Sequence, residues 1–112
     1  MKGIWILSNR KSVLMLLFDL PMVDKNKQKE YRLFRKNLKK NAYIQLQESV
    51  YVKLLHNTTN AYLEIERIRS ISPREGNIKL IPMSLNGFKK MLSIRGTEFN
   101  MSIFSDDVVI ID

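Results

Sequence analysis

An unbroken apolar segment, VLMLLFD at Val13–Asp19, is followed at once by Leu20-Pro21. Its length suits a β-strand, and because both alternating faces are apolar, such a strand must be covered on both sides. Proline cannot donate to a sheet ladder, so the strand has to end before Pro21. A membrane span would need about 20 apolar residues, which excludes that alternative for this segment. The segment therefore predicts a strand that is buried on both of its faces.

A helix is predicted over Lys25–Asn41, with Asp24 as its N-cap. At 100° per residue Leu33 falls outside the apolar sector of this helix, and we expect it to be only partly buried. The residues inside the sector, which should face the core, are Tyr31, Phe34 and Leu38.

Alternating polarity predicts strands at Tyr43–Gln47 and Val50–Leu55, which either pair antiparallel across a short turn or run on as one bent ribbon. A second helix follows, and Pro73 stops it. The apolar stripe of this helix consists of Ala61, Ile65 and Ile68. The remaining predicted elements are a strand at Asn77–Ile81, a short helix at Leu85–Leu92 and a final strand at Val108–Asp112.

In chain order these elements give β-α-β-β-α-β, the split βαβ or ferredoxin-like pattern of an α+β fold. We expect a single domain over residues 1–112, with an N-terminal extension at 1–12 and a C-terminal segment at 93–112. The final strand is left over from the pattern, and it is too apolar for an exposed sheet edge. It therefore predicts a homodimer in which this strand completes the sheet of the second subunit.

Charge and composition restrict the partners. The chain has 19 Lys and Arg against 11 Asp and Glu, a net charge of +8, so the expected partner is a polyanion. The absence of cysteine favours a reducing, cytoplasmic location and excludes a zinc finger. Polar residues interrupt the apolar runs of Met1–Val23, so neither a signal peptide nor a membrane span is predicted. DNA, RNA or an anionic membrane surface would suit the net charge; among these we expect nucleic acid as the partner and no membrane association.

Most of the positive charge lies on the first predicted helix. Between Lys25 and Lys40 there are eight basic residues and a single acid, Glu30. A solvated helix face usually mixes both signs, whereas a one-sided basic stripe favours binding to the phosphate backbone without base reading. A merely solvated face is the alternative interpretation. The predicted nucleic-acid-binding residues are Arg10, Lys11, Arg32, Arg35, Lys36 and Lys39.

Asp19 is the strongest single candidate for a catalytic or metal-binding residue. A carboxylate that ends a buried strand lies at the sheet rim, and magnesium typically takes one or two carboxylates together with waters and substrate phosphates. Two copies of Asp19 at a two-fold axis would supply such a site, which could polarise a phosphodiester or activate water. The alternative is an aspartate that closes a turn before Pro21. Asp19 is thus predicted to be both catalytic and metal-binding, with magnesium or another divalent cation as the bound ion.

Four segments together resemble one known family. Leu16–Pro21 (LLFDLP) is similar to its first strand, Tyr31–Leu38 (YRLFRKNL) to its first helix, Gln47–Tyr51 (QESVY) to its Q-x-S-V-Y element, and Gly76–Leu80 (GNIKL) to its G-x-[IV]-x-L strand. The family is that of the small CRISPR-associated endoribonucleases, the adaptation protein that partners the CRISPR integrase. The sequence looks closest to versions from systems with a single large effector nuclease. Ala42 departs from the glycine that many members carry before Phe or Tyr.

The resemblance implies a ferredoxin-like homodimer whose C-terminal strand swaps onto the partner's sheet. It implies that the dimer bridges two integrase dimers along the foreign DNA duplex that is captured as a new spacer. It also implies a magnesium site at Asp19, with metal-dependent phosphodiester cleavage of RNA or DNA that adaptation does not require. The residues of the swapped strand would be Val108, Val109, Ile110 and Ile111.

Two functions remain in competition. The first is an adaptor that binds the DNA duplex, and the second is primarily a magnesium-dependent endoribonuclease or endodeoxyribonuclease. We favour the adaptor, with weak and secondary endonuclease activity. One carboxylate at a strand end in each chain offers fewer acidic groups than an efficient nuclease would need. An RNA-binding ferredoxin-like module ranks below both, since the K/R-G-F type of signature is missing.

Overall fold

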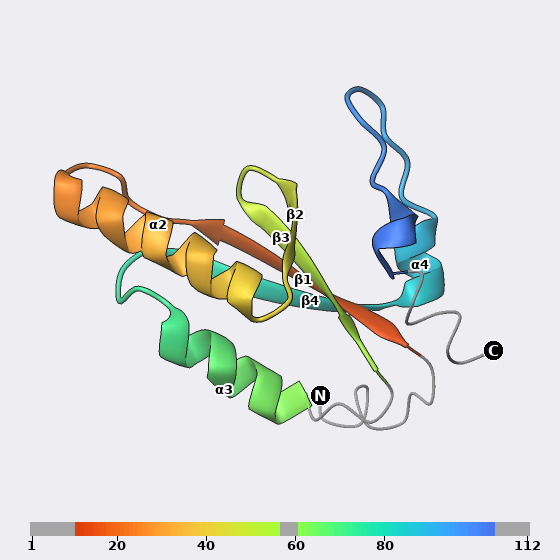
Figure 1. Ribbon diagram of the computed structural model, residues 1–112, viewed down its shortest axis with the longest axis horizontal. Helices are drawn as coiled ribbons and strands as arrows, with labels where there is room; N and C mark the ends of the chain where they lie inside the picture. The colour runs from red at the N-terminus through yellow and green to blue at the C-terminus, as the bar shows by residue number, and fades with distance from the viewer. Residues whose placement is uncertain (1–10, 57–60, 105–112) are drawn as a thin grey trace.

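The structure, a computed structural model, describes residues 11–56 and 61–104. Four strands form one antiparallel sheet in the order β2-β3-β1-β4, with β1 paired to both β3 and β4 (Figure 1). This topology confirms the ferredoxin-like α+β prediction. The elements are β1 (Ser12–Asp19), α2 (Lys25–Lys40), β2 (Ile44–Gln47), β3 (Val50–Leu55), α3 (Ala61–Ile71), β4 (Asn77–Ser84), α4 (Leu85–Lys89) and the 3-10 helix η1 (Met101–Phe104).

Elements pack on both faces of the sheet, which explains why β1 is apolar from Val13 to Phe18. On one face, Leu14, Leu16 and Phe18 of β1 join a core cluster with buried residues of α2 and α3. On the other face, Val13 packs in a second cluster with Phe88 of α4 and the 3-10 helix. Successive residues of a strand point to opposite faces, so one strand supplies both clusters. The predicted strand is confirmed, and its helix-covered face is fully buried, whereas on the other face Val13 is buried and Met15 and Leu17 are only partly buried.

Helix α2 follows its sequence pattern closely. Its N-cap is Asp24, whose carboxylate accepts a hydrogen bond of 2.8 Å from the backbone N–H of Lys27. The predicted core residues are the ones that are buried: Tyr31, Phe34 and Leu38. Leu33, predicted to be only partly buried, is 54% exposed, because none of the described residues forms a layer over the side of α2 that faces away from the sheet.

The turn after α2 accounts for the glycine that many members of the resembled family carry where this chain has Ala42. Ala42 has a φ of 69°, in the left-handed region. Its amide bonds to the carbonyl of Lys39, and the next amide, of Tyr43, bonds to the carbonyl of Leu38. Glycine reaches this conformation without steric cost, whereas a β-carbon is strained there.

The structure decides one alternative that the sequence left open, and it moves the predicted ends of two elements by three residues each. Strands β2 and β3 form an antiparallel hairpin with an irregularity between Gln45 and Gln47, so the alternative of one bent ribbon is wrong. Strand β4 continues to Ser84 through Pro82, which a strand at the edge of the described sheet tolerates. Helix α4 ends at Lys89, three residues before the predicted end.

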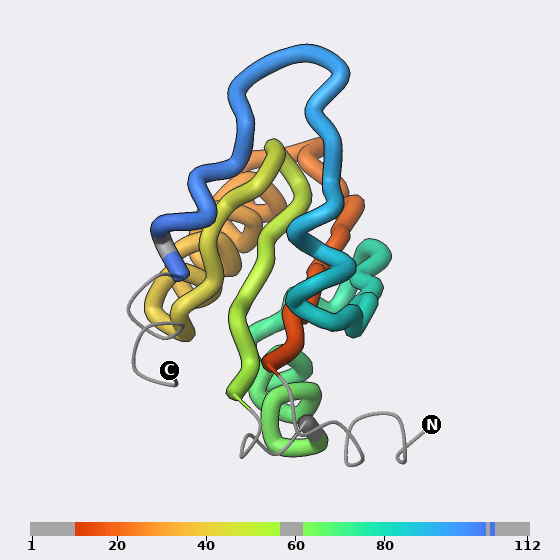
Figure 2. Tube along the Cα trace, turned by 90° about the vertical axis from the view of Figure 1, so that its right-hand side faces the viewer, coloured from red at the N-terminus to blue at the C-terminus, as the bar shows by residue number. Residues whose placement is uncertain are grey.

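The segment between α4 and η1 is a loop that projects beyond the sheet (Figure 2). Met91 and Phe99 at its two ends pack against the second core cluster, while Leu92 and Ile94 between them are exposed. The predicted final strand, Val108–Asp112, lies outside the described residues. Among the residues that are described, none of the helices is long and apolar enough to cross a membrane.

Candidate nucleic-acid interface and metal site

Six basic side chains lie on the solvent side of α2, and we call them the basic stripe. Within the described part of the chain, none of them forms an ion pair with a carboxylate. Other basic residues do form ion pairs: Lys27 pairs with Glu75, and both Lys53 and Arg67 pair with Glu64. The stripe therefore presents charge that the fold leaves unneutralised. Its members are Lys25, Lys29, Arg32, Arg35, Lys36 and Lys39.

This arrangement costs the helix some stability. Like charges four residues apart, such as Arg32 with Lys36 and Arg35 with Lys39, destabilise a helix by about 0.2–0.5 kcal/mol per pair. The buried apolar face of α2 offsets that cost, since most helical stability in proteins comes from tertiary packing. A chain that retains such repulsion without acids to relieve it has a surface suited to an external polyanion.

Arg35 differs from the rest of the stripe because it is half-buried and fixed. Its Nε donates a hydrogen bond of 3.0 Å to the hydroxyl oxygen of Tyr51, which raises the pKa of Arg35. Its guanidinium carbon lies 5.6 Å from the centre of the Tyr31 ring, within the range of a cation–π contact. The Tyr31 hydroxyl in turn donates to the Glu48 carboxylate at 3.2 Å, and burial raises the pKa of Tyr31.

Asp19 is the last residue of β1 and is exposed at the sheet rim, as the sequence predicted. It pairs in register with Asn77 of β4, and the amide of the preceding residue, Phe18, bonds to the carbonyl of Ser49 at 3.1 Å. Because Phe18 belongs to the cluster under α2, alternation places Asp19 on the opposite face. The basic stripe and Asp19 therefore belong to different faces of the sheet.

Gly76 holds the rim beside Asp19, a role that its position in a turn did not reveal. Its φ is +102°, and a β-carbon built there would lie 2.8 Å from the carbonyl oxygen of Asp19 and 2.6 Å from Leu20 Cδ2. A side chain at this position would be strained and would also push against the end of β1. The close contact between Gly76 and the end of β1 thus helps to set the position of the Asp19 backbone.

The donor set at Asp19 fits an open magnesium ligand and not a closed cage. Among the described residues, no group of three His, Cys, Asp or Glu side chains gathers to hold a metal. Magnesium commonly keeps several waters and binds through one or two carboxylates, so an exposed carboxylate at the rim can serve as one ligand. One chain offers one such carboxylate here, and a second would have to come from another copy.

The other predicted site residues do not join this arrangement. Lys11 precedes β1 at the end opposite to Asp19, where its Nζ lies 2.8 Å from His56 Nδ1. It therefore belongs to a different element from the basic stripe. Arg10 and the predicted dimer strand, Val108, Val109, Ile110 and Ile111, lie outside the described residues.

A buried carboxylate, Glu64 of α3, was missed by the sequence analysis although it is only 2% exposed. It accepts hydrogen bonds from the Tyr43 hydroxyl at 2.8 Å, from Lys53 Nζ at 3.0 Å and from Arg67 Nη1 at 2.8 Å. Burial and the bond to Glu64 raise the pKa of Tyr43. Three donors occupy this carboxylate, so it fixes α3 to the sheet. The available signal was its spacing, three residues before Arg67 and four before buried Ile68 on the same helix face.

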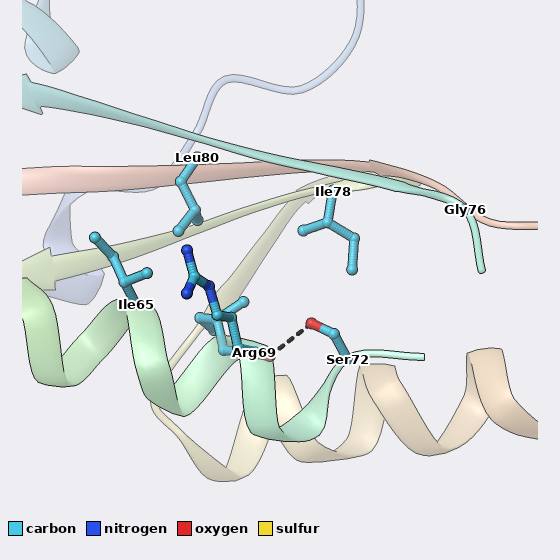
Figure 3. A pocket seen from close by; sticks show the side chains of 7 residues that line it. Ile65, Arg69, Ser72, Gly76, Ile78 and Leu80 are labelled. Carbon is cyan, nitrogen blue, oxygen red and sulfur yellow. Dashed lines mark hydrogen bonds between the residues drawn. The ribbon is translucent and has the colours of Figure 1, made fainter. Parts of the chain in front are cut away.

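A cavity of about 330 Å³ lies between α3 and β4 (Figure 3). Ile65 of α3 and Ile78 and Leu80 of β4 supply its apolar walls. Its polar groups are already engaged, because Arg69 pairs with Glu66 at 3.1 Å and the Ser72 hydroxyl bonds to a backbone carbonyl at 2.6 Å. The cavity is thus a hollow with both apolar and polar walls, beside the edge of the described sheet.

The sequence matches one protein family over most of its length. The family model described as CRISPR associated protein Cas2 matches residues 12–91, which contain β1, α2 and Asp19. A protein named CRISPR-associated endoribonuclease Cas2 from Streptococcus mutans serotype c (strain NN2025) is 36% identical over 94 residues, 84% of this chain and 87% of the relative. Proteins of the same name from Ligilactobacillus salivarius (36% over 83 residues, 74% and 82%) and Treponema denticola (30% over 96 residues, 86% and 95%) are similar. The chain therefore belongs to the CRISPR-associated Cas2 family.

Proposed function

We propose that this protein is an adaptor of CRISPR spacer acquisition that binds the backbone of a DNA duplex through the basic stripe. The observation that carries the proposal is the set of six cations on α2 that no described carboxylate neutralises. Phosphate contacts of this kind supply affinity without sequence information. Membership of the Cas2 family supports the CRISPR role.

In this proposal the protein acts as a homodimer that bridges two dimers of the CRISPR integrase. Strand β4 is an edge of the described sheet, Ile81 on it is 44% exposed, and the cavity between α3 and β4 lies beside it. A strand added to that edge by residues 108–111 of a second copy would satisfy the backbone of β4 and place apolar side chains near the hollow. Removal of residues 108–112 should then convert a dimer into a monomer in light scattering at micromolar concentration.

The second candidate activity is phosphodiester cleavage at Asp19, with RNA or DNA as substrate. The endoribonuclease names of the relatives and the exposed rim carboxylate support it. Bound magnesium would supply charge stabilisation at the scissile phosphate or an activated water. Asp19 of each subunit would hold that ion. We place this activity second because each described chain offers a single carboxylate there and no cluster of further ligands.

The two activities belong to different faces of the sheet, so substitutions should separate them. Charge reversal of Arg32, Arg35, Lys36 and Lys39 to Glu should abolish duplex binding at about 50 mM salt, where phosphate contacts are strongest. The matched control reverses four exposed cations outside α2, which changes the net charge equally: Arg74, Lys89, Lys90 and Arg95.

Duplex binding is measured by fluorescence anisotropy, and circular dichroism confirms that each variant is folded. The proposal expects loss of binding only in the stripe variant. Equal weakening in both variants would show that net charge alone drives binding, and the stripe would lose its assigned role.

A further inference from the structure

We infer that Arg35 is a fixed receptor for one phosphodiester of the bound backbone, and that Tyr51 and Tyr31 are positioning residues that hold its guanidinium. The inference rests on the proposed function, because it assigns distinct work to one member of the basic stripe. The five other members would attract the polyanion as mobile charges. Arg35 would set the position at which the backbone comes to rest.

The attachment of Arg35 uses only one edge of its guanidinium. Nε donates to Tyr51 at 3.0 Å, and the guanidinium carbon lies 5.6 Å from the centre of the Tyr31 ring. Among the described residues, no carboxylate lies within ion-pair distance of Arg35. The two terminal nitrogens therefore keep the donors that can bind a phosphate bidentately.

The partners of Arg35 are themselves held in place. Tyr51 has no exposed surface, and its ring stacks on Phe18 with centroids 5.8 Å apart and planes 27° apart. Tyr31 is buried, packs against Phe18 at 5.8 Å and donates its hydroxyl to Glu48. Both partners are uncharged, and the Glu48 carboxylate attracts the guanidinium only from beyond ion-pair distance, so these groups orient Arg35 without pairing its charge. Ordering a free arginine costs side-chain entropy on binding, and this cost is already met at Arg35.

A purely structural role makes different predictions. If Arg35 only satisfied the Tyr51 hydroxyl, its replacement would change stability and leave the affinity for nucleic acid like that of any other stripe variant. Lysine at position 35 separates the two interpretations, because it keeps the charge but has neither the Nε donor nor the planar fork. Arg32→Lys is the comparator, since Arg32 is an exposed arginine of the same helix.

The test measures the affinity of the full chain for DNA duplex and for RNA of the same length by fluorescence anisotropy at several salt concentrations. Arg35→Lys should weaken binding about tenfold, the equivalent of one charge-assisted hydrogen bond, and Arg32→Lys at most about twofold. Tyr51→Phe should weaken binding in the same direction with an unchanged salt slope, because it removes no charge. The double variant Arg35→Lys/Tyr51→Phe should be no weaker than Arg35→Lys alone, as expected for two parts of one unit.

Each outcome decides a separate question. Equal effects of Arg35→Lys and Arg32→Lys, or additive effects in the double variant, would overturn the inference while duplex binding stands. If the wild type binds neither nucleic acid at low salt, the proposed function itself fails. Should Tyr51→Phe prove unstable by thermal melting, the comparison of the two lysine variants still decides, because both lie on one helix surface. Preference for DNA or RNA in the wild type identifies the source of the phosphodiester.

Discussion

Replacement of Arg32, Arg35, Lys36 and Lys39 by alanine removes four of the six cations of the basic stripe and leaves the buried face of α2 intact. For duplex DNA, the logarithm of the binding constant falls against the logarithm of salt concentration with a slope of about 0.9 per phosphate contact. Four contacts per chain therefore account for about 3.6 units of slope (4 × 0.9). Between 50 and 200 mM salt, that difference amounts to roughly 150-fold in affinity.

The assay is a salt titration of duplex binding by anisotropy, with the wild type, the four-alanine stripe variant and a control variant. The control replaces Arg74, Lys89, Lys90 and Arg95 with alanine, which removes the same charge from other surfaces. The stripe variant should show the shallower slope, and the control should keep the wild-type slope. Parallel titration lines for the wild type and the stripe variant would refute the assignment of phosphate contacts to α2.

Three further predictions concern single residues. Asp19→Ala should abolish any metal-dependent cleavage of labelled RNA or DNA and leave duplex affinity unchanged, because Asp19 and the stripe belong to opposite faces; parallel loss of both would contradict this separation. Ala42→Gly should raise the free energy of unfolding by about 0.5–1 kcal/mol in urea titrations. The left-handed conformation costs a residue with a β-carbon about 1–2 kcal/mol, and the larger chain entropy of glycine in the unfolded state offsets about half of the stability gained by relieving that cost. Glu64→Ala should lower the free energy of unfolding by about 3 kcal/mol, near the low end for a broken buried pair because Arg67 is half-exposed, and a change below about 1 kcal/mol would remove Glu64 from its anchoring role.

Local patterns were sufficient for most of the fold. The apolar run of β1, the cap at Asp24 and the 100° sector of Tyr31, Phe34 and Leu38 depend on neighbours in sequence, and all three are confirmed. The position of Asp19 at a rim also follows from its place at the end of that run.

Features that depend on the third dimension were not predictable in the same way. From the sequence alone, Glu64 resembles any exposed glutamate of a helix. Its partners Lys53 and Tyr43 are distant in sequence and come close to it only in the folded protein. The exposure of Leu33 depends on which side of α2 lacks a covering layer. The separation of Asp19 from the basic stripe depends on which face α2 covers, and alternation along β1 alone does not say which.

Integration of a short DNA duplex by the cognate integrase tests the central claim most directly, with the wild type, Asp19→Ala and the four-residue glutamate variant of the stripe compared in one assay. The adaptor account predicts that Asp19→Ala supports integration as well as the wild type does, and that the stripe variant supports none. Loss of integration in Asp19→Ala with retention in the stripe variant would contradict it, and the metal site would then belong to the mechanism of acquisition.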